Sequence, residues 1–369
     1  MFKHLALYSF LFLVLSSCFK DELPPGTYDS LDKALQNPSS VKKLILRKGL
    51  EEFPMEVLRL ENLTFLDLGF NKFTEIPADI QKLSQLEILY LDGNQLTHLP
   101  KEIGRLQLLK NLHLGENNLQ ELPSEFSNLT DLLSLTVSGN RIDTLNFNMS
   151  KLINLKQLFI DRNPIQYLDI SNSSIIELYA RSCKLDTIPT TIFSCSNLKL
   201  INLSENSIKD IPNNIIALQK LNELILDANR IENFPEIIYG INSLRGLSLQ
   251  NNQISVLPQN ISELDSIYYF LIGNNRISQI PASIGKLQNL NRFEAAQNRI
   301  ESLPKEIGDM QELHQLDFSF NALSTLPEEF KKLDNPRSAR YLLFKENLFS
   351  DSEKEKIKSY FTNNVSITF

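Results

Sequence analysis

Residue types that commonly perform catalysis or hold metals are sparse in this sequence of 369 residues, which contains three Cys and four His. Three Cys cannot form a framework of disulfides, and four scattered His do not predict a His-rich metal site. The motifs Gly-x-Ser-x-Gly, His-Glu-x-x-His and Cys-x-x-Cys are absent, and so is a Gly-rich loop ending in Gly-Lys-Ser/Thr. We therefore expect a protein that is not an enzyme and uses no metal or cofactor.

The charged residues exclude a second class of function. The formal net charge is −7 and the sequence pI is about 5.3, with no dense run of Lys and Arg to neutralise nucleic-acid phosphates. Carboxylates recur in rows at positions that should be solvated, and nothing in the sequence sets their pKa values apart as an acid–base pair requires. The hydrophobic fraction of 42% is sufficient for a buried core. The composition predicts a folded, acidic protein that does not bind nucleic acid.

One Cys has a distinctive context near the N-terminus. Lys3 precedes an apolar run from Leu5 to Leu15, which is too short to cross a bilayer as a helix and suits a secretion signal. The run ends in Leu15-Ser16-Ser17-Cys18, and here the sequence resembles a bacterial lipoprotein signal. The resemblance implies that residues 1–17 are removed and that Cys18 carries several acyl chains, which anchor a protein stably. The alternative is an ordinary signal peptide with an incidental Cys.

Residues 18–28 are predicted to form a flexible tether. Pro24-Pro25-Gly26 cannot join a helix or a central strand. Lys20-Asp21-Glu22 resembles the short acidic signal that directs lipoproteins to the outer face in one branch of Gram-negative bacteria, although a solvated charge cluster is the simpler alternative. The expected location is the bacterial outer membrane, lipid-anchored and facing the cell surface, with a periplasm-facing protein as the alternative.

The dominant feature of the sequence is an internal repeat marked by Asn. Most markers are 23 residues apart, with apolar residues five and three positions before each marker, as at Leu89 and Leu91 before Asn94. Most units also have Leu-Pro, Ile-Pro or Phe-Pro five and six positions after the marker. The markers are Asn71, Asn94, Asn117, Asn140, Asn163, Cys183, Asn206, Asn229, Asn252, Asn275, Asn298, Asn321 and Asn347, and Gly49 takes this place in the first of about fourteen units.

This pattern resembles the leucine-rich repeat, in its short 23-residue subfamily, over roughly residues 41–349. The implied fold is an α/β solenoid, a horseshoe with a parallel β-sheet on its concave face and 3₁₀ or short turns on its convex side. The alternating Leu-x-Leu segment independently predicts one short strand per unit. No unit can bury its apolar pair alone, so neighbouring units must stack into one sheet.

The marker residues have a structural interpretation. A buried Asn amide can bond the backbone groups left unpaired where the chain turns out of each strand. Leaving such groups unpaired would cost ~1–3 kcal/mol each. By the resemblance, Cys183 is a tolerated substitute for Asn. Cys195 stands where other units have Leu, so both cysteines should be buried core groups.

Both ends of a solenoid need caps, because the last core layer would otherwise face water. Residues 29–43 are predicted to form a helical N-terminal cap, with a helix from Asp29 or Ser30 to Gln36 and a first strand over Val41–Leu46. The repeats should occupy residues 44–349, and residues 350–369 the C-terminal cap. There, Ser350 and Glu353 fit a capping box for a helix ending near Phe361, followed by an edge strand over 365–369.

The sequence predicts a membrane-anchored, non-catalytic protein that binds a partner on its concave face. A protein partner is favoured, with a surface glycan as the alternative, and the membrane is contacted only through the lipid anchor. A monomer is favoured. A scaffold for envelope assembly, facing the periplasm, is the competing function.

The candidate binding surface lies at the irregular middle units, where Asn146 and Asp169 replace Pro and the unit ending at Cys183 is three residues short. A shorter return segment should give the face a distinct shape. Exposed aromatic and Arg side chains are frequent at binding hot spots. Drift of the repeat is the alternative explanation. The candidate residues are Tyr90, His113, Phe159, Asp161, Tyr179 and Arg181.

Overall fold

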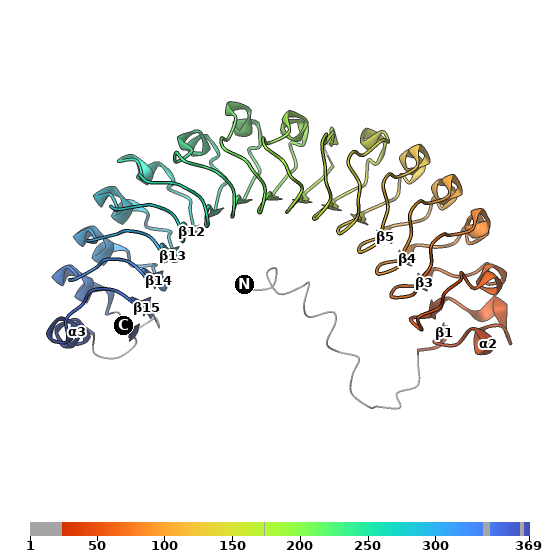
Figure 1. Ribbon diagram of the computed structural model, residues 1–369, viewed down its shortest axis with the longest axis horizontal. Coiled ribbons are helices and arrows are strands. Elements are labelled where there is room, and N and C mark those ends of the chain that lie inside the picture. The colour runs from red at the N-terminus through yellow and green to blue at the C-terminus, as the bar shows by residue number, and fades with distance from the viewer. Residues whose placement is uncertain (1–23, 173, 335–339, 362–364) are drawn as a thin grey trace.

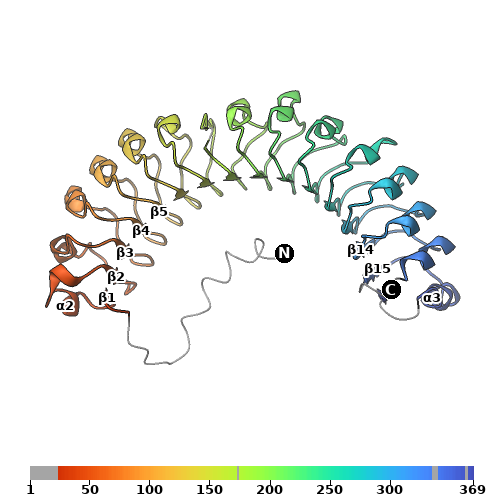
Figure 2. The ribbon, with the colours of Figure 1, turned by 180° about the vertical axis from the view of Figure 1, so that it is seen from behind.

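A computed structural model describes residues 24–172, 174–334, 340–361 and 365–369. The predicted signal segment 1–17, Cys18 and the first residues of the tether lie outside the described residues. Within the described ranges, sixteen strands form one parallel sheet whose spatial order follows the chain from β1 to β16. The chain winds into an arc with the strands on the inner side and short helical turns on the outer side (Figures 1 and 2). This is the predicted solenoid.

The strands are short and nearly uniform in length. They are β1 Thr27–Tyr28, β2 Lys43–Ile45, β3 Phe65–Asp67, β4 Ile88–Tyr90, β5 Asn111–His113, β6 Ser134–Thr136, β7 Gln157–Phe159, β8 Glu177–Tyr179, β9 Leu200–Asn202, β10 Glu223–Ile225, β11 Gly246–Ser248, β12 Tyr269–Leu271, β13 Arg292–Glu294, β14 Gln315–Asp317, β15 Arg340–Leu343 and β16 Val365–Thr368. Neighbouring strands keep the same register, as in Leu89↔Leu112. A shift by one residue would turn the buried middle residue of a three-residue strand away from the core.

The helical elements lie on the convex side and at the two ends. The α-helices are α2 Leu31–Ala34 and α3 Asp351–Lys358. The 3₁₀ turns are η1 Pro38–Ser40, η2 Met55–Arg59, η3 Ala78–Lys82, η4 Lys101–Arg105, η5 Ser124–Asn128, η6 Met149–Lys151, η7 Thr190–Ser194, η8 Asn213–Ala217, η9 Glu236–Gly240, η10 Ile261–Glu263, η11 Ala282–Lys286, η12 Lys305–Asp309 and η13 Glu328–Leu333. In the regular units a Pro immediately precedes the turn and accepts its first hydrogen bond, as Pro100 does from the Ile103 N–H at 3.1 Å.

One continuous apolar core runs through the arc from Ala34 to Ile357. Each repeat contributes the same set of side chains, such as Leu86, Leu89 and Leu91 from the strand segment, none of them more than 1% exposed. The apolar side chains of each repeat pack against those of the repeats before and after it, since one repeat alone cannot enclose its apolar side chains.

The short repeat differs from the others on the convex side. Among the described residues, no 3₁₀ turn separates β7 from β8. Asn172 lies there instead, and its side-chain amide donates to the carbonyl oxygens of Met149 at 2.7 Å and Leu152 at 2.9 Å. A single side chain therefore satisfies the carbonyls that the preceding turn presents.

The caps agree with the expected types but not with all the expected limits. Helix α2 ends at Ala34, before the expected Gln36, and Ser30 occupies its N-cap position without a side-chain hydrogen bond. The first strand is not the expected Val41–Leu46 but β1, which pairs with β2. A two-residue strand directly after Pro-Pro-Gly has no alternation that the sequence could reveal.

The C-terminal cap follows the predicted order of helix and strand. The Ser350 hydroxyl accepts a hydrogen bond from the Glu353 N–H at 3.2 Å, and α3 ends at Lys358, three residues before the expected Phe361. Strand β16 then pairs in parallel with β15 and forms the last edge of the sheet.

Candidate binding surface

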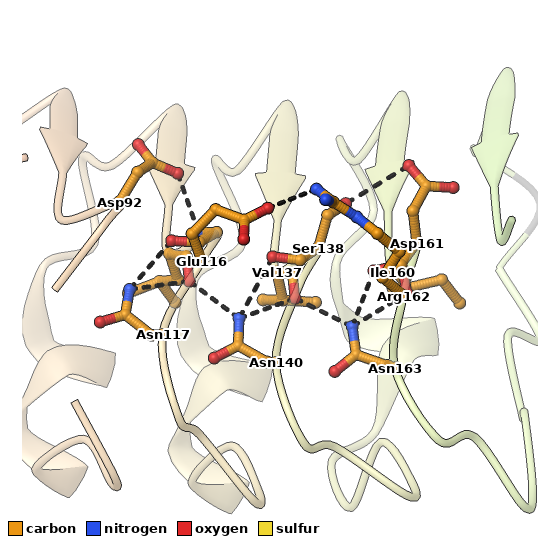
Figure 3. A network of polar contacts seen from close by, with 12 residues as sticks. Asp92, Glu116, Asn117, Val137, Ser138, Asn140, Ile160, Asp161, Arg162 and Asn163 are labelled. Carbon is orange, nitrogen blue, oxygen red and sulfur yellow. Dashed lines mark hydrogen bonds and ion pairs between the residues drawn. The ribbon is translucent and has the colours of Figure 1, made fainter. Parts of the chain in front are cut away.

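The marker Asn side chains form a continuous ladder along the buried side of the strand ends. The Asn94 amide nitrogen donates to the carbonyl oxygens of Leu68 and Leu91, both at 3.0 Å, and its oxygen accepts from the Phe73 N–H at 3.1 Å. Figure 3 shows the equivalent row of Asn117, Asn140 and Asn163. Each marker thus joins its own repeat to the one before it.

Cys183 occupies the same position in the short repeat. Its thiol donates to the carbonyl oxygen of Ile160 at 3.3 Å, and its backbone N–H donates to the Asn206 side-chain oxygen at 2.9 Å. Burial raises the pKa of the Cys183 thiol to about 12, so it is protonated at neutral pH. The geometry gives it a structural contact rather than a reactive thiolate.

Tyr90 and His113 stack on the concave face. Their ring centroids are 4.2 Å apart and their planes are 8° from parallel, and Phe65 packs against Tyr90 from the preceding strand. Strands β4 and β5 place the two residues directly opposite each other. Burial lowers the pKa of His113 to about 4, so the imidazole is neutral and presents an aromatic rather than a cationic surface.

Phe159 and Tyr179 form a second stack on β7 and β8. Their ring centroids are 4.7 Å apart, and Tyr179 remains partly exposed. Phe159 is only 8% exposed, so the expectation that it is an exposed contact residue is wrong. The Tyr179 ring lies against it, which leaves Tyr179 to contact a partner. Burial, together with the negative charges of Glu177 and Glu223, raises the pKa of the Tyr179 phenol.

Asp161 and Arg181 belong to adjacent repeats of the irregular middle segment and are hydrogen-bonded to each other. The Arg181 backbone N–H donates to the Asp161 carboxylate at 2.7 Å, and the Ser138 hydroxyl donates to the same carboxylate at 3.4 Å. Burial raises the pKa of Asp161, although these hydrogen bonds oppose the shift. The exposed Arg181 guanidinium pairs with Glu205 from the next repeat, which raises the pKa of Arg181.

An ion pair that spans two repeats was not foreseen from the sequence. Arg162 pairs with Glu116, which lies two repeats earlier in the chain (Figure 3). Gly139 is in the repeat between them and lies against the Glu116 side chain. A Cβ atom on Gly139 would lie 2.6 Å from the Glu116 carboxylate oxygen, so a side chain there would displace this carboxylate. Gly139 has a φ of +69°, a left-handed conformation that glycine adopts without strain. The sequence feature that could have indicated this ion pair is a glycine, Gly139, midway between two opposite charges that are 46 residues apart.

A polar cluster toward the N-terminus was also missed. Arg47 pairs with the buried carboxylate of Asp67 at 2.6 Å. Asp92 accepts a hydrogen bond from the Gly115 N–H at 2.8 Å, and burial raises the pKa of Asp92 to about 6. The charges of Asp67 and Asp92 act on Tyr90, and that of Asp67 also acts on His113, so the concave face in the first third of the arc combines aromatic rings with carboxylates.

The part of the chain that the structure describes contains no group of three or more His, Cys, Asp or Glu side chains placed to hold a metal ion. Among the same residues, no helix is both long and apolar enough to span a bilayer. The concave face is an extended surface of rings and paired charges, an arrangement suited to recognition by contact.

A single curved parallel sheet whose successive repeats are joined by an Asn ladder defines a leucine-rich-repeat solenoid. Models of leucine-rich repeats match residues 61–101, 88–180 and 166–231. The structure of a leucine-rich-repeat protein from Leptospira interrogans is similar, with 31% sequence identity and a TM-score of 0.83, covering 93% of this chain and 99% of that one. The chain belongs to the leucine-rich-repeat family. Proteins of this family generally serve as binding scaffolds rather than as catalysts.

More distant structures share the fold. An internalin from Listeria monocytogenes is 21% identical, with a TM-score of 0.67 over 92% of this chain and 93% of that one. The plant peptide hormone receptor RGFR1 in complex with RGF2 is 26% identical, with a TM-score of 0.52 over 89% of this chain and 63% of the receptor. A search of curated proteins gives no match.

Proposed function

We propose that this protein is a membrane-anchored, non-catalytic binding module that binds a protein partner through the middle of its concave face. The observation that carries the proposal is the Phe159–Tyr179 stack beside Arg181, where a partly exposed phenol adjoins an exposed guanidinium. Tyr and Arg dominate the energetics of protein interfaces. The plant receptor of similar fold, solved in complex with RGF2, supports the idea that such an arc binds a peptide or protein.

The proposed location is the surface of a bacterial outer membrane, with the acyl chains of Cys18 as the anchor. The support is the Leu15-Ser16-Ser17-Cys18 sequence and the overall similarity to a Leptospira interrogans protein. An envelope scaffold facing the periplasm is the competing proposal. Protease treatment of intact cells distinguishes the two, since complete protection of the protein would eliminate the surface location.

The double variant Tyr179→Ala, Arg181→Ala should weaken partner binding by about 2 kcal/mol or more, because both side chains are partly exposed and central on the face. The partner is first isolated with the folded protein as bait, and its affinity is then measured by calorimetry. The matched control is Tyr167→Ala with Lys184→Ala, a similar exposed pair beyond the strand ends. Unchanged affinity for the first variant would reject this site, and a captured glycan instead of a protein would correct the partner class.

Cys18→Ser should abolish lipid attachment, because serine lacks the thiol that is lipidated in the lipoprotein pathway that the signal resembles. The measurement is labelling with a radioactive fatty acid followed by membrane fractionation. The control is Cys195→Ser, which changes a buried cysteine far from the signal. A Cys18→Ser protein that still acquires label and remains with the membrane would contradict the anchor.

A further inference from the structure

A second row of backbone hydrogen bonds joins neighbouring repeats beyond the ends of the strands. In the regular repeats, the residue directly after the marker donates its N–H to a carbonyl of the repeat before it. Arg141 donates in this way to Leu119 at 2.8 Å, and Ser207 donates to Leu185 at 2.7 Å. The two successive junctions that lie between these examples lack the bond.

Pro164 and Lys184 occupy the donor position at these two junctions. Pro164 has no N–H to donate. By the pattern of the other repeats, the Lys184 N–H would pair with the Ile165 carbonyl, but neither group has a hydrogen-bond partner among the described residues. The second junction therefore holds one backbone donor and one backbone acceptor that are not used by the fold.

The segment after Pro164 is paired only with the repeat before it. The Gln166 N–H donates to the Asp143 carbonyl at 2.8 Å, and Tyr167 forms an isolated parallel bridge with Thr144. In the described part of the chain, no backbone hydrogen bond joins residues 164–168 to residues 184–188. The space between these two segments is therefore free of backbone pairing.

A cavity of about 470 Å³ is lined by the same two segments, residues 164–168 and 184–191. Its volume is within the range of ordinary ligand sites. The exposed residues of its lining are mostly polar, and Tyr167 adds an aromatic ring. The buried residues of its lining include four apolar side chains, none of them more than 6% exposed: Ile165, Leu168, Leu185 and Ile188. The cavity thus combines an apolar floor with a polar rim, and we call it the junction cavity.

The backbone of Lys184 is strained. Its φ is +60°, in the left-handed region that residues with a side chain rarely adopt. Every other non-glycine residue of positive φ in the described ranges directly precedes a marker, as Arg162 and Glu205 do, whereas Lys184 directly follows one. Strain of this kind persists where the surrounding structure enforces it, and it is frequent at binding sites.

We propose that the junction cavity binds an extended peptide segment of a partner protein, which inserts one apolar side chain between the two repeats. Consecutive peptide groups of an extended chain point to opposite sides, so one N–H can donate to the Ile165 carbonyl while a neighbouring carbonyl accepts from the Lys184 N–H. Main-chain hydrogen bonds then supply affinity, and the apolar floor selects the inserted side chain. The junction cavity is separate from the concave face, so its ligand is a second partner.

The experiment uses unlipidated protein, residues 24–369, which contains every described strand and both caps. The probe is a displayed library of random heptapeptides, selected on the immobilised protein. The enriched peptides should share one apolar residue at a fixed place, because a single side chain enters the floor. Absence of enrichment, or enrichment without a shared apolar residue, would overturn the proposal.

Thr187→Trp tests whether the selected peptides occupy the junction cavity. Thr187 is an exposed residue of its lining, and an indole there should weaken binding of a synthetic enriched peptide at least ~30-fold by filling the space. The matched control is Thr325→Trp, exposed at the same position of a regular repeat, which should change the affinity less than ~2-fold. Circular dichroism verifies that both variants are folded. Equal affinities for the two variants would mean that the peptides bind elsewhere.

Two further measurements distinguish this site from the concave face and test the backbone contacts. The double variant Tyr179→Ala, Arg181→Ala should bind the peptide as the natural protein does, and a loss of binding there would assign the peptide to the concave face instead. N-methylation of the peptide at one nitrogen beside the apolar residue should weaken binding ~10-fold, since the Ile165 carbonyl loses its donor. If every singly methylated peptide binds as tightly as the parent, the proposed main-chain pairing is wrong.

Discussion

Asn229→Ala is expected to lower the free energy of unfolding by about 3 kcal/mol or more, one of the largest effects for a single polar side chain in this fold. The Asn229 amide donates to the carbonyl oxygens of Leu203 and Leu226, both at 3.0 Å, and accepts from the Ile208 N–H at 3.0 Å. Alanine would leave three backbone groups without these partners in a place that water does not reach, at ~1–3 kcal/mol each. Urea denaturation followed by circular dichroism measures the change.

The control for this variant is Asn233→Ala, four residues further along the same repeat. Asn233 is exposed, so its loss should change the free energy of unfolding by less than about 0.5 kcal/mol. If the two variants unfold at the same urea concentration, the ladder does not stabilise the fold in the way its hydrogen bonds indicate.

Leu226→Ala should destabilise the protein by ~2–5 kcal/mol, because it removes a fully buried side chain from the layer shared with the repeats on both sides. The neighbouring Asp227 points to the concave face and accepts hydrogen bonds from the Ser248 hydroxyl and the Gln250 N–H. Asp227→Asn keeps an acceptor at this position and should cost less than ~1 kcal/mol. Thermal melting followed by circular dichroism compares the two, and equal melting temperatures would contradict the inward and outward assignment of the strand residues.

The strands, the turns and the ladder could be predicted from the sequence because each repeat carries the same local pattern. The alternation around Leu89 and Leu91 selects strand geometry, and the Pro after Leu99 stops it. When the repeats stack on one another, only one arrangement brings the Leu side chains of successive repeats into contact. The same reasoning places Tyr90 opposite His113, since both hold the same position in adjacent repeats.

Side-chain contacts between repeats could not be predicted in this way. The burial of Phe159 depends on how the Tyr179 ring turns, and the pairing of Arg162 with Glu116 depends on the absence of a side chain at Gly139. The two-residue strand β1 carries no periodicity of its own. These features depend on the three-dimensional packing of particular side chains. A pattern shared by all repeats carries no information about such individual contacts.

The reach of the Asn ladder has an evolutionary consequence. Each marker amide bonds only its own repeat and the one before it, as Asn94 does, so duplication or loss of a whole repeat lets the ladder close again with its neighbour. Insertion or removal of one whole repeat is therefore expected to change the length of the arc without breaking the ladder. The Glu116–Arg162 pair is an exception, because it measures a distance of two repeats. We expect a change of repeat number inside the segment from Glu116 to Arg162 to separate this pair, whereas a change outside it leaves the pair intact.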